Sequence, residues 1–197
     1  MKILAFADPH NSLTAFEKVS KLAKKAKVDY ILCAGDITLF GHNIEAVMKK
    51  LNKLPAPVLL IHGNHEDEEV VEFLAKELKN IRFIHGKAIR IGKVLFLAYG
   101  GEGFRIRMPE FDQLAKLWKK EIRKRDKIIL MLHQPPYGVA DLVLDEHAGS
   151  KSFTKFIKDV QPALVFCGHL HENFGVEGHI GKSHVVNPGP YGRIFDV

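Results

Sequence analysis

The chain has 197 residues, of which 46% are hydrophobic and 26% are charged, and its formal net charge at pH 7 is +6. This length suits one domain with a proper core, and the composition is typical of a globular protein, not of a disordered or fibrous one. No apolar run approaches the roughly 20 residues that a membrane-spanning helix needs. We therefore expect one domain over residues 1–197 and no membrane partner.

The positive charge raises the question of nucleic-acid binding. Most lysines are scattered over the expected solvent faces of helices, and the tight basic cluster Arg123-Lys124-Arg125 ends a helix, where cations suit the helix dipole. Solvated helix faces explain this pattern better than a nucleic-acid groove. The positive field would still attract a phosphorylated substrate.

The start of the chain and its cysteines bear on location. The opening run, residues 1–7, stops at Asp8 without a small-residue cleavage site, so we predict a strand and not a signal peptide. Cys33 and Cys167 each lie inside an apolar run just before a glycine, which is typical of buried free thiols in a reducing compartment. We expect a cytoplasmic protein.

The first half of the chain alternates short apolar runs with amphipathic segments. The apolar runs lie at 2–7, 30–35 and 58–63. The segments after them have helical spacing and begin near Ser12, near Ile44 and at the acidic residues Glu66 to Glu69, which suit a helix N-terminus. This βαβαβα order predicts parallel strands joined by crossover helices.

The middle of the chain changes character. Three short apolar runs, at 81–85, 88–91 and 94–99, are separated by Gly86-Lys87 and Gly92-Lys93. This spacing predicts an antiparallel meander.

The last third returns to helix–strand alternation. A helix from Pro109 precedes the apolar run at 128–132, and a helix around Phe156 precedes the run at 163–167. The tail, residues 173–190, predicts two more strands around a glycine-rich turn. The whole pattern predicts a mixed α/β fold.

Residues that bind metals stand at the ends of five apolar runs. In chain order they are Asp8 and His10, Asp36, Asn64, His133, and His169 and His171. Ligands of α/β sheets bind beyond the carboxyl ends of the strands, so these side chains are expected to converge. Two aspartates, one asparagine and four histidines, with one aspartate shared, could complete the inner shells of two cations about 3.5–4 Å apart.

The order of these motifs resembles that of the calcineurin-like metallophosphoesterases. The motifs are DPH at 8–10, GD at 35–36, GNHE at 63–66, HQPP at 133–136 and GHLH at 168–171, and VNPGP at 186–190 is also similar. The resemblance spans nearly the whole chain. It implies a β-sandwich of mixed sheets flanked by helices, with metals at the C-terminal ends of strands.

The resemblance also assigns ligands to two divalent ions. It implies one metal held by Asp8, His10, Asp36 and His171, and a second held by Asp36, Asn64, His133 and His169. With nitrogen and oxygen donors and no thiolate, Mn²⁺, Fe, Zn²⁺, Co²⁺ and Ni²⁺ all suit such a site, and Mn²⁺ is our preferred ion.

Several residues near the metal-binding motifs are not expected to bind a metal. By the resemblance, His65 binds no metal but stabilises a phosphoryl oxygen or protonates the leaving group. Glu66 is expected to be an acid of the first helical turn, and structural roles are favoured for His62 and His85. His147 is left as a residue that could approach the site.

The loop at 100–109 is expected to line the substrate pocket through Arg105 and Arg107, with a plain surface loop as the equal alternative.

Protein Ser/Thr phosphatases of the superfamily carry an Asp and an Arg where this chain has Leu39 and Phe40. A protein substrate is therefore disfavoured, and what orients His65 is left open.

The resemblance implies hydrolysis of a phosphodiester or phosphomonoester by a hydroxide that bridges two metals. The leading hypothesis is an enzyme for a small or nucleotide-like phosphoester. A metal-dependent nuclease is the alternative, and a non-catalytic scaffold on the same fold is a third hypothesis, which the intact ligand set disfavours. The oligomeric state and the choice between monoester and diester are left open.

Overall fold

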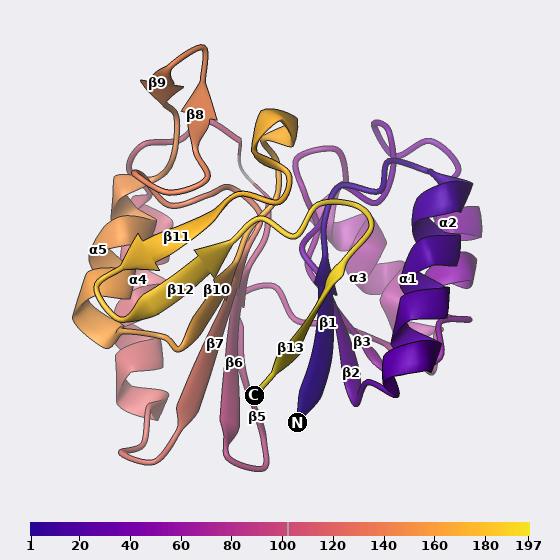
Figure 1. Cartoon of the computed structure of the whole chain (residues 1–197), viewed down its shortest axis with the longest axis horizontal. Coiled ribbons are helices and arrows are strands. Elements are labelled where there is room, and N and C mark those ends of the chain that lie inside the picture. The colour runs from indigo at the N-terminus through magenta and orange to yellow at the C-terminus, as the bar shows by residue number, and fades with distance from the viewer. Residues whose placement is uncertain (102) are drawn as a thin grey trace.

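The computed structural model describes residues 1–101 and 103–197. Two mixed β-sheets face each other at the centre of the molecule, and helices cover both outer faces (Figure 1). The fold is therefore a sandwich of mixed sheets flanked by helices, as the sequence predicts. No helix in these ranges is long and apolar enough to cross a membrane.

The first sheet carries the amino-terminal half of the chain. Its strand order is β13-β1-β2-β3-β4. The strands are β1 (Lys2–Phe6), β2 (Tyr30–Cys33), β3 (Val58–Leu60), β4 (Ile81–Phe83) and β13 (Arg193–Asp196), and the helices that connect the first four are α1 (Leu13–Ala26), α2 (Ile44–Leu51) and α3 (Glu68–Lys76). Strands β1 to β4 are parallel, which confirms the crossover topology, whereas β13 runs antiparallel to β1.

The second sheet carries the remaining strands in the order β11-β12-β10-β7-β6-β5. Its strands are β5 (Lys87–Ile91), β6 (Val94–Tyr99), β7 (Lys127–Leu132), β10 (Leu164–Phe166), β11 (Glu177–Ile180) and β12 (Ser183–Val186), and its helices are α4 (Pro109–Glu121) and α5 (Lys151–Val160). A small hairpin, β8 (Leu142–Val143) and β9 (Glu146–His147), and a short 3-10 helix, η1 (His171–Asn173), complete the chain.

The expected antiparallel meander over 81–99 is wrong in its first strand. Strand β4 pairs in parallel with β3, and only β5 and β6 form an antiparallel hairpin. Between β4 and β5 the chain turns at Gly86, which has a φ of 67°, and passes to the other sheet. A glycine turn marks a change of direction, but it does not show whether the next strand joins the same sheet.

Alternation along the strands divides the core into three layers. Leu4 and Phe6 pack in the cluster that lies under helices α1 to α3. Ile3 and Ala5, their neighbours along β1, point instead into the cluster between the two sheets. A third cluster joins the second sheet to α4 and α5. Because both faces of each sheet are covered, the strands read as continuous apolar runs.

This arrangement brings five loops to one edge of the sandwich. They follow β1, β2, β3, β7 and β10, the strands whose carboxyl ends carry the expected metal ligands. The buried free thiols Cys33 and Cys167 lie close below them, at the end of β2 and just after β10.

Candidate metal centre

The loops that carry the site have unusual backbone geometry. Asp8, His10, Asp36 and His169 have φ values of 55°, 40°, 50° and 69°. Residues other than glycine adopt this left-handed conformation uncommonly, although Asn, Asp and His do so more often than the rest, and such conformations cluster at functional sites. Asn11, at 63°, also has it, as expected for an asparagine.

Glycines let these loops approach one another closely. A Cβ on Gly63 would collide with the carboxylate of Asp36, and one on Gly168 would lie 2.7 Å from Oδ2 of Asp8. The glycines of the GNHE and GHLH motifs are therefore needed because the carboxylates pass directly over their backbone.

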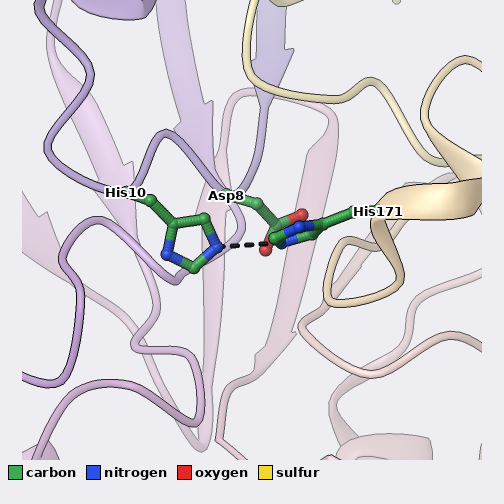
Figure 2. Close-up of side chains that lie close together, drawn as sticks. All are labelled: Asp8, His10 and His171. Carbon is green, nitrogen blue, oxygen red and sulfur yellow. Dashed lines mark hydrogen bonds between the residues drawn. The ribbon is translucent and has the colours of Figure 1, made fainter.

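One half of the centre consists of Asp8, His10 and His171, which we call the outer cluster. Each offers a ligand atom, and these atoms lie within 4.8 Å of one another. Nε2 of His10 lies 2.9 Å from Nε2 of His171, and Figure 2 shows Asp8 beside this pair. Asp8 is buried, His10 is partly buried and His171 is exposed, so this half opens to solvent.

The other half consists of Asp36, His133 and His169, which we call the inner cluster, again with ligand atoms within 4.8 Å. Nε2 of His133 lies 3.5 Å from Oδ2 of Asp36 and 3.0 Å from Oδ1 of Asn64. Nε2 of His169 is buried and has no hydrogen-bond partner among the described residues. Such an orphaned nitrogen is expected where a ligand belongs.

Asp36 connects the two clusters. The same oxygen, Oδ2, lies 3.5 Å from Nε2 of His133 and 3.9 Å from Nε2 of His10. Its other oxygen accepts a hydrogen bond from the backbone N–H of His65, which fixes the carboxylate. The structure thus brings together all seven residues that the sequence singled out, with Asp36 where a shared ligand would stand.

Hydrogen bonds at the far side of two imidazoles prepare them for a metal. Nδ1 of His10 donates to the carbonyl oxygen of Thr38, and Nδ1 of His133 donates to that of Ala34, both at 2.8 Å. A neutral imidazole carries one proton, so each ring, when neutral, has its lone pair on Nε2, which faces the centre. This is the usual outer support of a metal-binding histidine.

In His65 the two ring nitrogens have the opposite hydrogen-bonding roles: Nδ1 accepts and Nε2 donates. Its Nε2 lies 3.8 Å from Oδ2 of Asp36, near enough to join a cluster with His10 and Asp36. However, its Nδ1 accepts a hydrogen bond of 3.3 Å from the backbone N–H of Phe40. The proton of the neutral ring is therefore on Nε2, which makes His65 a donor toward the centre and a poor metal ligand.

The same criterion excludes a further histidine cluster. His62, Glu68 and His85 have ligand atoms within 4.8 Å of one another. Nδ1 of His85 accepts a hydrogen bond of 2.8 Å from the N–H of Gly100, so its proton lies on Nε2, 3.6 Å from the Glu68 carboxylate. We assign this cluster a structural role, in agreement with the sequence analysis.

Burial and charge perturb the ligands strongly. Burial raises the pKa of Asp8 to about 7. Burial also opposes the charged forms of Asp36 and His133, but their hydrogen bond overrides it, lowering the pKa of Asp36 to about 2 and raising that of His133 to about 9. Burial lowers the pKa of His169 to about 4, so this imidazole is neutral and able to bind a metal.

The donor set fits divalent cations. Carboxylate, amide and imidazole groups are ligands that Mn²⁺, Zn²⁺ and similar ions accept. In the inner cluster the charge of Asp36 is balanced by the His133 proton, which is a proton that a cation would replace. We conclude that these clusters can hold divalent metal.

Glu66 corrects one expectation. Helix α3 begins at Glu68 with Asp67 as its cap, so Glu66 lies before the helix and is not an acid of its first turn. It is only 7% exposed, and its carboxylate accepts hydrogen bonds from the N–H and hydroxyl of Thr38 and from the N–H of Gly63. Glu66 therefore ties together the loops after β2 and β3.

The carboxy-terminal VNPGP segment supports the opposite side. The amide of Asn187 donates to the carbonyl of Leu170, and the carbonyl of Gly189 accepts from the N–H of Ala7. The loop that carries His171 and the strand that leads to Asp8 are thus joined through this segment.

The loop at 100–109 contacts the metal centre through a phenylalanine. Glu102 lies outside the described residues. Arg105 contacts the Glu110 carboxylate at 3.2 Å and Arg107 is exposed, whereas the Phe104 ring packs on His169 at a centroid distance of 4.7 Å. Phe104 thus contacts the inner cluster, and the expected role of Arg105 and Arg107 in the substrate pocket stays a prediction.

His147 does not join the clusters. Its Nδ1 lies 2.7 Å from the buried carboxylate of Asp141, which also accepts hydrogen bonds from the N–H groups of Gly138 and Gly149. This pairing holds the loop around the β8–β9 hairpin.

Comparison with known proteins places the chain in a family. The family model for calcineurin-like phosphoesterases matches residues 1–173. An uncharacterized protein of Methanocaldococcus jannaschii is 33% identical, over 96% of this chain and 88% of its own length.

Solved structures share the fold at lower identity. A protein of Thermus thermophilus matches with a TM-score of 0.74 at 24% identity, over 96% of this chain and 89% of its own. A dimetal phosphatase from Danio rerio matches with a TM-score of 0.68 at 11% identity, over 94% and 86%. The chain belongs to the calcineurin-like phosphoesterases, a family of metal-dependent hydrolases of phosphoric esters.

Proposed function

We propose that the protein hydrolyses small or nucleotide-like phosphoesters with two divalent ions, and that Mn²⁺ is the ion of the active enzyme. The observation that carries the proposal is the position of Asp36, whose Oδ2 lies between His10 of the outer cluster and His133 of the inner cluster. In this proposal Asp8, His10 and His171 hold one ion, and Asn64, His133 and His169 hold the other. Asp36 binds both.

The ions, when bound, supply Lewis acidity toward the phosphoryl oxygens and lower the pKa of the attacking water. The chain contributes positioning and a hydrogen-bond donor. The Nε2–H of His65 points toward Asp36 and so toward the space where a phosphoryl group would bind. A fixed donor at this place stabilises the charge that develops on a phosphoryl oxygen. A proton on Nε2 suits both roles that the sequence allows for His65, and we propose stabilisation of the phosphoryl oxygen because this nitrogen lies 3.8 Å from Asp36, beside the proposed ions.

The position of the basic cluster favours a small substrate over a nucleic acid. Arg123-Lys124-Arg125 precedes β7, whereas His133 follows it. A strand of six residues separates them, which is a length of about 20 Å at 3.3 Å per residue. The cluster is therefore at the other end of the sheet and cannot guide a strand of nucleic acid into the centre by direct contact.

A metal-dependent substrate panel tests the proposal. The purified protein would be stripped with a chelator, reloaded with Mn²⁺ and assayed on aryl monophosphates, aryl phosphodiesters, cyclic nucleotides and oligonucleotides. We expect hydrolysis of small esters that requires metal and disappears with the chelator. Cleavage confined to oligonucleotides, with an affinity whose salt dependence has a slope of about −0.7 per phosphate contact, would instead establish the nuclease alternative. Absence of hydrolysis after loading would favour the scaffold.

A further inference from the structure

Two exposed phenylalanines border the metal centre. Phe40 is 80% exposed and Phe104 is 65% exposed. The Phe40 ring stacks on the His65 imidazole, with centroids 4.1 Å apart and 19° between the ring planes. The Phe104 ring meets His169 edge-on at 4.7 Å. Because His65 lies beside the outer cluster and His169 belongs to the inner one, the two rings border different halves of the centre.

The backbone conformation of Phe40 is unfavourable as well, which indicates that the exposed ring has a role. Its φ of 49° lies in the left-handed region, which bulky residues avoid. An apolar ring in water and a strained backbone are both unfavourable, and neither contributes to the core. Such a combination persists where the surroundings impose it, which is a feature of binding and catalytic sites.

The turn that carries Phe40 is held in place from several directions. The Thr38 hydroxyl donates to Glu66 and accepts from the N–H of Gly41, and the N–H of Leu39 donates to Oδ1 of Asn11 at 2.8 Å. The ring is thus preorganised, with one face on His65. Its high exposure leaves the other face open to solvent.

We propose that Phe40 and Phe104 bind the planar aromatic group of the substrate, with the open face of Phe40 as the stacking surface. A nucleobase is the group of this kind that a nucleotide-like phosphoester carries. The inference rests on the proposed function, because the phosphoryl group must bind at the metals for the base to reach Phe40.

The Phe40 ring lies near the metal centre. Nε2 of His65 lies 3.8 Å from Oδ2 of Asp36, and the Phe40 ring stacks on the same imidazole. A ligand with its phosphoryl group at the metals and its base on the open face of Phe40 must carry a linker between them, as the sugar of a nucleotide does. Base–aromatic stacking accepts any base, since every base has a π-face.

A role for Phe40 in holding His65 alone would have a different signature. Such a role affects turnover of all substrates alike, whereas a stacking surface distinguishes ligands with a base from ligands without one. Adenosine 5′-monophosphate and ribose 5-phosphate differ only in the base, so the ratio of their inhibition constants isolates its contribution. Changes in turnover cancel in this ratio.

The experiment measures both inhibition constants with the Mn²⁺-loaded full chain, against hydrolysis of bis(p-nitrophenyl) phosphate. We expect the nucleotide to bind about 10-fold more tightly than the sugar phosphate, the scale of base–aromatic stacking. Phe40→Leu, which keeps an apolar side chain and the strained backbone, should bring the ratio close to one, and Phe104→Leu should lower it. Phe40→Tyr should preserve it. Phe73→Leu, at a ring of α3 that is 67% exposed, is the matched control and should leave the ratio unchanged.

Equal inhibition constants in the unaltered protein would overturn the inference and leave the proposed function standing. A ratio that survives both Phe40→Leu and Phe104→Leu would overturn it as well. If the unaltered, metal-loaded protein hydrolyses no phosphoester, the proposed function itself fails, and the inference fails with it.

Discussion

The two halves of the metal centre differ in burial and in support. In the inner cluster, His133 is fully buried, its Nδ1 is bonded to Ala34 and its Nε2 lies between Asp36 and Asn64. In the outer cluster, His171 is exposed and its ring meets that of His10. Ligands that are fixed before the metal arrives lose little freedom on binding. We therefore expect the inner ion to bind more tightly and to exchange more slowly than the outer one.

The largest effect should come from the residue that both halves share. Asp36→Asn keeps the shape of the side chain but removes its charge, so both ions should be lost, with a fall in affinity beyond the roughly 10–100-fold typical of an outer-shell partner. His171→Asn should lose the outer ion alone, and high Mn²⁺ should restore part of the activity. Metal analysis by mass spectrometry gives the stoichiometry of each variant. If the Asp36→Asn variant retained two ions, the claim that Asp36 binds both ions would be contradicted.

His65 tests whether a histidine beside the outer half acts as a donor or as a ligand. His65→Asn should keep both ions and slow turnover by about 10²–10⁴-fold, the scale of a positioned catalytic group. Because its donor is assigned to a phosphoryl oxygen, esters with good and poor leaving groups should be slowed equally. Rates for nitrophenyl and alkyl esters, with metal content, check this. A loss of metal would contradict the tautomer assignment, whereas a larger loss for alkyl esters would show that His65 protonates the leaving group instead.

Glu66 supports the loops of both clusters from below. Glu66→Gln replaces an acceptor of three hydrogen bonds with a group that must itself donate, so Mn²⁺ affinity should fall by about 10–100-fold. The free energy of unfolding of the metal-free protein should fall by about 1–3 kcal/mol. Calorimetric titration and denaturant unfolding measure the two effects. Glu69→Gln, at an exposed acid of α3, is the control, and an equal effect of both substitutions would contradict the role given to Glu66.

The smallest effect is that of pH, and its sign follows from the pKa values of the ligands. With pKa values of about 7 for Asp8 and about 9 for His133, lowering the pH from 8 to 7 leaves His133 protonated and begins to protonate Asp8. Metal binding must release these protons, so Mn²⁺ affinity should fall by about tenfold over this interval, and more steeply below it. Titrations in buffers of different ionisation enthalpy count the protons. Affinity independent of pH would contradict these shifts.

The sequence predicts which candidate ligands lie together because each of them follows an apolar run. A strand fixes the direction of its last residue, so the loops after β1, β2, β3, β7 and β10 had to converge if the strands were parallel. The sequence does not predict the partner of a short strand such as β4, because its two buried apolar residues, Ile81 and Phe83, could pack in either sheet. Strand β13 and the β8–β9 hairpin are also short and largely exposed, so no apolar run marks them in the sequence.

The supporting residues are harder to predict than the ligands. In sequence, Glu66 is one of several acids before a helix, and its burial depends on the approach of Thr38 from a separate loop. Phe40 and Phe104 look like ordinary apolar residues, and their position beside His65 and His169 is set by loop conformation and not by periodicity. The roles of Arg105 and Arg107 in the substrate pocket stay predictions, whereas the contact of the neighbouring Phe104 with His169 was not predicted.

The central claim is that seven residues hold two ions that share Asp36. Anomalous diffraction from crystals soaked in Mn²⁺ tests it most directly. We expect two peaks about 3.5–4 Å apart, one bound by the outer cluster and one by the inner cluster, with Asp36 bound to both. A single peak at saturating Mn²⁺, or a second peak among His62, Glu68 and His85, would contradict the claim.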